Sequence, residues 1–171
     1  LKCDPISAFG GIVSCNYKVT KKIAQELKKL FFEVIIANNF DFDALKILKT
    51  KKNLRLIDAS KYIFKSDLKF TSNNEEILVQ SEDIKKMNIK DFKVVSRKKP
   101  NTKQMKDLLF AFNVCRYVKS NAIVLASNET TTGIGSGQPS RLDSCQIAID
   151  KMKKFADTKG EIVAASDAFF P

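Results

Sequence analysis

The chain has 171 residues, 44% of them hydrophobic, which is enough for a core in one domain or two small lobes. No apolar run approaches the roughly 18 residues of a membrane span, so we expect neither insertion nor secretion. Lys and Arg outnumber Asp and Glu by 30 to 19, but 26 of the 30 are lysines, whereas specific nucleic-acid binding favours arginine. We therefore expect a solvated lysine surface that at most attracts an anionic ligand.

The first 60 residues predict a parallel α/β layer. Apolar residues recur at helical spacing in the two longer segments, and the short runs VIIA and LRLI are typical of parallel strands covered by helices. The expected strands are 10–15, 33–37 and 53–59, and the expected helices are 19–32 and 41–52.

Residues 61–99 change character and predict a β-rich connector. Two alternating segments, 62–70 and 75–80, flank the polar turn TSNN, which indicates an antiparallel hairpin. A short helix and a strand at FKVVS, residues 92–96, are expected to follow.

Residues 100–171 predict a second α/β lobe, so that the expected division is 1–60, 61–99 and 100–171. Strands are expected at 121–127 and 161–166. Ser140 and Asp143 have the spacing of a capping box at the start of a helix. The matching order of elements suggests a duplicated fold. The two long helices are expected to bury Met105, Leu108, Leu109, Phe112, Cys115 and Val118 in one case, and Leu142, Cys145, Ile149, Met152 and Ala156 in the other.

Four isolated cysteines and the absence of histidine argue against a metal site. Zinc sites draw on clustered Cys and His, and no CxxC pair is present. Reduced cysteines on apolar faces pack as small hydrophobic groups, which favours a cytoplasmic protein. Because the chain begins at Leu1 and ends on FFP, we expect it to be a piece of a longer protein.

The stretch TTGIGSGQPSR, residues 131–141, is the most unusual motif. Its glycines do not have the spacing of a dinucleotide fingerprint, and it lacks the Gly-Lys-Ser/Thr ending of a phosphate-binding loop. Alternating glycines before a Ser-capped helix could hold a polar or anionic ligand close to backbone amides, or could merely form a reverse turn. From spacing alone both interpretations remain open.

Polar residues near this stretch favour a binding site at a sheet edge. Ser120 and Asn121 open the strand before the glycines, although they could simply cap the preceding helix. With Arg141, Asp167 and Phe169 they would supply a donor set, a cation, a carboxylate and an aromatic ring.

Several motifs together resemble the aminoimidazole carboxamide ribonucleotide (AICAR) formyltransferase family, the transformylase domains of bifunctional purine biosynthesis proteins. The motifs occur in the family's order and span nearly the whole chain. They are DPISAFGGIV (4–13), FFEVIIA (31–37), KKNLRLI (51–57), DLLFAFNVCRYVKSNAIV (107–124), GIGSGQPSRLDS (133–144) and ASDAFFP (165–171).

The resemblance implies two cytidine-deaminase-like three-layer α/β/α lobes. It also implies formyl transfer from 10-formyltetrahydrofolate to the amine of AICAR on the route to inosine monophosphate, in a bacterial cytoplasmic homodimer without a metal, nucleic acid or membrane partner. Such a site must orient two substrates, remove a proton and stabilise an oxyanion.

The resemblance also assigns residues. Phe9 would form an aromatic wall and Glu33 would bind the nucleotide, while Asn121 would hold the carboxamide and formyl region as a catalytic residue. The glycine stretch becomes a substrate-binding turn. The full AICAR set is Phe9, Gly10, Glu33, Asn121, Arg141 and Phe169, and the folate set is Ile6, Phe9, Leu142, Phe169 and Pro171, with Asp167 supporting the last turn.

One departure limits the expected activity of this chain. The family's catalytic Lys-His pair belongs to a KHxNPCG-like motif upstream of DPISAFGG, and the chain contains neither this motif nor a histidine. We therefore expect the chain alone to be inactive. The rival interpretations are a basic nucleic-acid-binding module and a zinc deaminase, although the deaminase motifs H-x-E and P-C-x-x-C are absent.

Overall fold

The computed structural model describes residues 3–62, 68–85, 87–157 and 160–169. The chain forms two compact units. The N-terminal unit comprises Ser7–Lys85, and the C-terminal unit comprises Lys86–Pro171 together with Leu1–Ile6. The α/β class predicted from the sequence is confirmed, and the three-part division stays a prediction.

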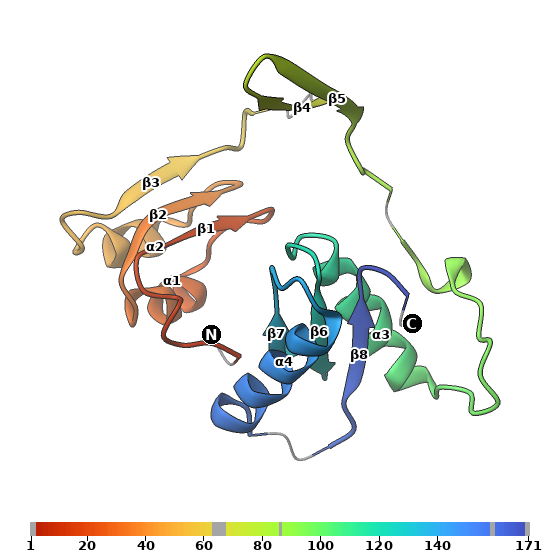
Figure 1. The fold of residues 1–171 in the computed structure, drawn as a ribbon. Helices are drawn as coiled ribbons and strands as arrows, with labels where there is room; N and C mark the ends of the chain where they lie inside the picture. Colours follow the sequence, from red (N-terminus) through yellow and green to blue (C-terminus); the bar gives the residue numbers. More distant parts are fainter. Residues whose placement is uncertain (1–2, 63–67, 86, 158–159, 170–171) are drawn as a thin grey trace. The chain divides into compact units, whose positions relative to one another are not determined.

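The N-terminal unit contains the predicted parallel sheet, in the order β1-β2-β3 (Figure 1). Helices α1 and α2 pack against each other, and their Ala24, Ala44 and Leu48 share a core with Ile35 and Ala37 of β2. The elements are β1 (Gly11–Cys15), α1 (Lys21–Lys28), β2 (Phe32–Ala37), α2 (Phe42–Leu48) and β3 (Arg55–Asp58).

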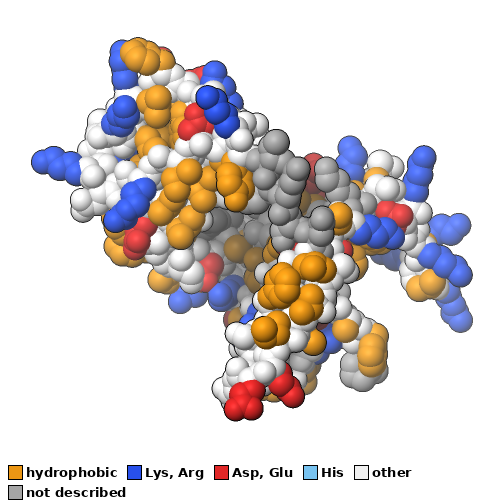
Figure 2. Space-filling model, turned by 90° about the horizontal axis from the view of Figure 1, so that it is seen from above, with side chains coloured by type: hydrophobic (Ala, Val, Ile, Leu, Met, Phe, Trp, Pro, Cys, Tyr) orange, Lys and Arg blue, Asp and Glu red, His pale blue; other side chains and the backbone are white. Residues whose placement is uncertain are grey.

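The predicted hairpin is present as β4 (Leu68–Asn73) and β5 (Glu76–Ser81), joined through Asn74 and Glu75. Its register places Phe70 opposite Val79 and Ser72 opposite Ile77, so one face is mainly apolar. These strands are exposed along their whole length, and Figure 2 shows apolar side chains gathered on the hairpin with acidic groups at its turn.

Residues 92–96 form no strand, contrary to the prediction. The short helix is η1 (Ile89–Asp91), and the chain then continues without regular structure to Asn101. An alternating pattern indicates a strand only where a neighbouring strand accepts its hydrogen bonds, and FKVVS has no such partner in the described chain.

The C-terminal unit has three layers, with an antiparallel sheet of order β7-β6-β8 between two helices (Figure 1). Every residue of β6 is buried, because alternate side chains enter two cores: Val124 and Ala126 face α3, whereas Ile123 and Leu125 face α4. The elements are α3 (Thr102–Cys115), β6 (Ile123–Ser127), β7 (Thr130–Gly135), α4 (Arg141–Phe155) and β8 (Val163–Ser166).

The first part of the glycine stretch, residues 131–135, lies in the strand β7, which corrects its assignment as a single turn. Gly133 and Gly135 lie in β7, and a Cβ at these positions would stand 2.0 Å from the Ala148 carbonyl oxygen and 1.8 Å from that of Ser144. Both glycines therefore allow the backbone of α4 to approach the sheet. Only Gly137, with φ +69°, uses the freedom of glycine in a turn.

The helix faces also differ in part from the predictions. Phe112 is 37% exposed, while Asp107, Ala111 and Cys115 are the buried residues of α3. In α4, Ser144 and Ala148 are buried against β7, because the close approach of the helix to Gly133 and Gly135 leaves room only for small side chains there. Leu142, which was predicted to be buried, is exposed. Cys145, Ile149 and Met152 pack on the core as predicted.

Candidate functional site

Three segments of the C-terminal unit converge at one end of its sheet. Since β6 and β8 run antiparallel, with Ile123 opposite Ser166, the residues before β6 lie beside those after β8. Gly135, also opposite Ile123, leads through a short loop into α4. The topology thus places Asn121, Arg141 and Asp167 at the same sheet edge, as predicted from the sequence.

The guanidinium group of Arg141 links these segments. One terminal nitrogen donates to Asp167 Oδ1 at 2.6 Å and to Ser166 Oγ at 2.9 Å, and the other donates to Asn121 Oδ1 at 2.8 Å. The side chains of Arg141 and Asp167 are only 15% and 17% exposed, so the ion pair is shielded from solvent. Three of the five guanidinium N–H groups are used in this way.

Asp167 receives three kinds of donor. Its carboxylate accepts hydrogen bonds from Ser120 Oγ, from the Ala122 backbone N–H at 3.1 Å and from Arg141. Burial raises the pKa of this carboxyl, but the donors outweigh burial and lower the pKa to about 2. Asp167 is therefore ionised at neutral pH and balances the charge of Arg141.

Asn121 fastens the loop that follows β7. Its amide nitrogen donates to the carbonyls of Gln138 at 2.9 Å and Pro139 at 2.7 Å, while its own backbone N–H donates to Gln138 at 3.1 Å. Ser144 Oγ donates to the Asn121 backbone carbonyl at 2.6 Å. A substrate that accepts a hydrogen bond from the Asn121 amide nitrogen must therefore replace one of these carbonyls, whereas the amide oxygen can accept from a substrate as well as from Arg141.

Ser140 caps α4 as predicted. Its hydroxyl accepts from the backbone N–H groups of Leu142 at 3.2 Å and Asp143 at 3.4 Å. The cap fixes the first turn of α4, and with it the position from which the Arg141 side chain reaches the sheet edge.

In the N-terminal unit, Phe9, Gly10 and Glu33 form a separate group. The ring of Phe9 lies 4.9 Å from that of Phe31, and the Gly10 N–H donates to the Phe31 carbonyl at 3.0 Å. Gly10 has φ +73°, and a Cβ built on Gly10 would lie 3.8 Å from Glu33 Oε1. Phe9 is 75% exposed, so its aromatic face is available.

The remaining folate positions are apolar and exposed. Ile6, Leu142 and Phe169 all present most of their side chain to solvent, and Pro171 lies outside the described residues. Their grouping around a ligand stays a prediction.

Across the described ranges, no cluster of three or more His, Cys, Asp or Glu side chains could hold a metal ion. None of the described helices combines the length and apolar character of a membrane span.

One buried polar residue was missed in the sequence. Asp107 is a buried carboxylate that accepts from the backbone N–H groups of Asn128 at 3.1 Å and Glu129 at 2.6 Å, which fixes the turn between β6 and β7. Its position four residues before Ala111 and eight before Cys115, on one helical stripe, was the available signal. Cys115, in contrast, is buried as predicted, and burial together with the negative charge of Asp167 raises the pKa of its thiol to about 11, so the thiol stays protonated.

The chain is similar to known proteins over its whole length. The model of the "AICARFT/IMPCHase bienzyme" family matches residues 1–151. Three relatives are named bifunctional purine biosynthesis protein PurH. The Parvibaculum lavamentivorans protein is 44% identical and is matched over 100% of this chain and 34% of its own length. The proteins of Aquifex aeolicus and Clostridium botulinum strain Eklund 17B are 46% and 48% identical, over 99% and 98% of this chain and 33% and 32% of their own lengths.

This chain thus spans about a third of the length of these relatives. The matched region includes the elements that carry Asn121 and Arg141. The chain belongs to the AICARFT/IMPCHase bienzyme family.

Proposed function

We propose that this chain is the central part of an AICAR formyltransferase, which transfers a formyl group from 10-formyltetrahydrofolate to AICAR during inosine monophosphate synthesis. Family membership and the names of the relatives support this proposal. The complete protein would also carry the cyclohydrolase activity, and we infer a cytoplasmic homodimer. Folate acts as co-substrate, and the proposed reaction uses no metal.

We further propose that the two units correspond to the duplicated cytidine-deaminase-like lobes. The three-layer arrangement of the C-terminal unit supports this assignment. The N-terminal unit differs from it in two ways: its elements follow the order β1-α1-β2-α2-β3 rather than α3-β6-β7-α4-β8, and its sheet is parallel rather than antiparallel. The matching order of elements expected from the sequence is therefore not observed, and the proposal of a duplicated fold rests on the family resemblance and on sheets packed against helices in both units.

The arrangement at the sheet edge suits the binding of a polar planar substrate. The Arg141 guanidinium keeps two N–H donors beyond those bound to Ser166, Asp167 and Asn121, and its orientation is fixed on three sides. Donors held in place before binding cost little to reorganise when charge develops on the formyl oxygen. Arg141 and Asn121 would thus orient AICAR and the formyl group, with Phe169 of the same unit as an aromatic wall.

We infer that proton transfer relies on residues outside this chain. The chain has no histidine, Asp167 is ionised at neutral pH, and the Cys115 thiol is protonated and buried. None of these groups can remove a proton from the attacking amine near pH 7. We therefore propose that the base belongs to the family's Lys-His pair and that residues 1–171 alone are inactive.

The fixed position of the Arg141 guanidinium is the observation that carries the proposal, and Arg141→Lys tests it. In a full-length protein that carries this sequence, tetrahydrofolate formation from AICAR and 10-formyltetrahydrofolate is followed by absorbance. A lysine ammonium cannot bridge Asn121 and Asp167 as the planar guanidinium does, so we expect kcat/KM to fall about tenfold or more. The control is Arg55→Lys on β3, which is exposed and should leave kcat/KM unchanged.

Two outcomes would contradict the proposal. An inactive full-length protein would exclude the formyltransferase activity, and an unaffected Arg141→Lys variant would exclude the role of the guanidinium. Salt-sensitive binding of single-stranded RNA by an inactive protein would instead favour the nucleic-acid alternative.

A further inference from the structure

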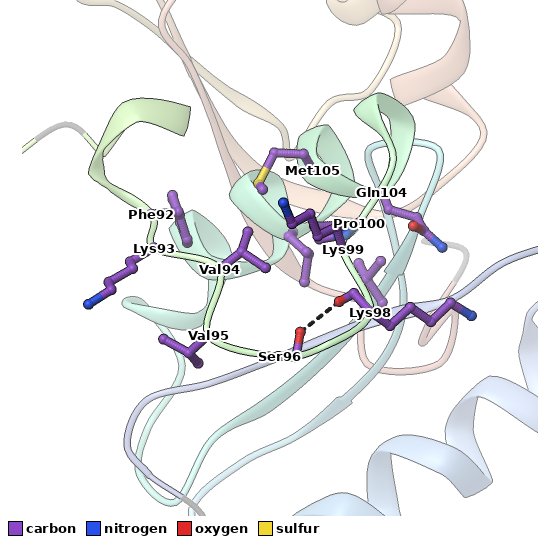
Figure 3. A pocket seen from close by; sticks show the side chains of 12 residues that line it. Phe92, Lys93, Val94, Val95, Ser96, Lys98, Lys99, Pro100, Gln104 and Met105 are labelled. Carbon is purple, nitrogen blue, oxygen red and sulfur yellow. Dashed lines mark hydrogen bonds between the residues drawn. The ribbon is translucent and has the colours of Figure 1, made fainter.

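A pocket of the C-terminal unit lies under the segment between η1 and α3. Both ends of this segment are attached to α3. Phe92 packs edge-to-face on Phe112, with ring centroids 5.5 Å apart at 82°, and Asn101 and Gln104 exchange hydrogen bonds of 2.8 and 2.9 Å. Between these points the chain arches away from the helix, as Figure 3 shows. The hollow is therefore a consequence of two fixed ends.

The pocket has the size and apolar floor of a small-molecule site. Its volume is about 430 Å³, which is within the usual range for such ligands. Val94, Met105, Leu108 and Val163 provide apolar surface from the loop, from α3 and from β8. Ser96 Oγ donates to the Lys98 carbonyl at 2.7 Å and stiffens the loop.

The rim of the pocket is positively charged. Lys93, Lys98 and Lys99 all line it, and residues 92–103 contain no Asp or Glu. In the described part of the chain, none of these three ammonium groups forms an ion pair with a described carboxylate. Figure 3 shows Lys93 and Lys98 extending outward on opposite sides of the loop. The pocket thus combines an apolar floor with lysines that no described carboxylate neutralises.

We propose that this pocket binds a small organic anion with a flat apolar body, of the class of aromatic carboxylates and sulfonates. The apolar body would displace water from the floor, and the anionic group would pair with the lysine rim. None of the lining residues is among those assigned to AICAR or folate. The site is therefore a second one, and it does not depend on the proposed formyl transfer.

The test compares two probes with the same aromatic body. The anion 8-anilinonaphthalene-1-sulfonate and the neutral N-phenyl-1-naphthylamine are titrated by fluorescence into the full-length protein. The double variant Lys98→Gln/Lys99→Gln should weaken binding of the anion at least about fivefold and leave binding of the neutral probe unchanged. The matched control is Lys153→Gln/Lys154→Gln on α4, which removes the same charge from exposed positions outside the pocket.

A second variant tests the apolar floor. Val94→Glu places a carboxylate inside the pocket and should weaken binding of the anion about tenfold or more, with thermal unfolding confirming that the fold is kept. The proposal is overturned if no saturable binding occurs, or if Lys98→Gln/Lys99→Gln binds the anion as the wild type does. It is also overturned if Phe70→Ser on the exposed hairpin removes the signal instead.

Discussion

The two groups of expected substrate residues are held in different ways. In the C-terminal unit, Arg141, Asp167 and Asn121 are joined by hydrogen bonds of 2.6 to 2.8 Å and are largely shielded from solvent. In the N-terminal unit, Phe9 is 75% exposed and its ring packs on that of Phe31. The polar group, Arg141, Asp167 and Asn121, is thus fixed before a ligand binds. The aromatic group, Phe9 and Phe31, becomes buried only when a ligand or another surface covers Phe9.

The sheets that carry these groups explain the contrast. Both faces of β6 are covered, by α3 and by α4, so residues at its edge lie against packed neighbours. In the parallel sheet, α1 and α2 share a core with one face, while Ile12 and Ile57 remain exposed on the other. Parallel sheets are normally covered on both faces, so the aromatic group belongs to a layer that the described chain leaves half covered.

The largest expected effect on stability comes from Gly135→Ala, which disrupts the packing of α4 on β7 that positions Arg141. The added methyl group would stand 1.8 Å from the Ser144 carbonyl oxygen, and backbone atoms cannot turn aside as a side chain can. Helix α4 must then move away from β7 and carry Arg141 with it. We expect the free energy of unfolding to fall by about 3 kcal/mol or more, measured by urea denaturation.

Gly160→Ala provides the control for this prediction. The nearest atom to its added methyl group would be Ser127 Oγ at 4.0 Å, which is an ordinary contact. We expect a change within about 0.5 kcal/mol. Equal effects of the two substitutions would mean that close packing of α4 on β7 does not determine the position of Arg141.

The comparison also shows which parts of the fold could be predicted from the sequence. Elements with their own periodicity, such as β6 and the β4–β5 hairpin, were predicted because local pattern and tertiary environment agree. The strand predicted at 92–96 was wrong, because pairing depends on a partner that the local pattern cannot reveal. The glycines were placed in a turn because spacing alone cannot distinguish backbone freedom from close helix packing.

Part of the candidate site could also be predicted. Asn121, Arg141 and Asp167 were grouped correctly, because the order of elements brings these chain segments to one sheet edge. Their hydrogen-bond partners Ser144 and Ser166 could not be predicted, since each depends on the register of a strand or on a helix contact. The buried Asp107 was missed because its partners are backbone groups of a distant turn.

A smaller effect is expected from Asp167→Asn, and it should depend on pH. The folded-state pKa of Asp167, about 2, lies below the ordinary aspartate value of 3.8, so the carboxylate stabilises the fold fully above about pH 4. This contribution is lost as the pH falls from 3.8 toward 2. We expect the free energy of unfolding of the wild type to exceed that of the variant by on the order of 1 kcal/mol at pH 6 in urea denaturation, because the cost of burying the carboxylate offsets part of what its donors contribute.

The difference between wild type and Asp167→Asn should shrink steadily when the same titrations are repeated at pH 4, 3 and 2.5. Asp143→Asn, at the exposed first turn of α4, is the matched control. A difference that stays constant down to pH 2.5 would mean that the ionised carboxylate contributes nothing through Arg141, and the contrast between the two groups would then rest on packing alone.

The smallest effect on stability is expected for Phe9→Ala in the aromatic group. Because the ring is already 75% exposed, its removal costs little hydrophobic burial, and we expect a loss of no more than about 0.5 kcal/mol. The matched control is Phe32→Ala, whose ring belongs to the core of the same unit and whose loss should cost about 3 kcal/mol. In the full-length protein, Phe9→Ala should instead raise the KM for AICAR or folate, since the proposed burial of this ring occurs only with substrate. A large loss of stability with unchanged KM would show that Phe9 is a structural residue and that the two groups do not differ as described.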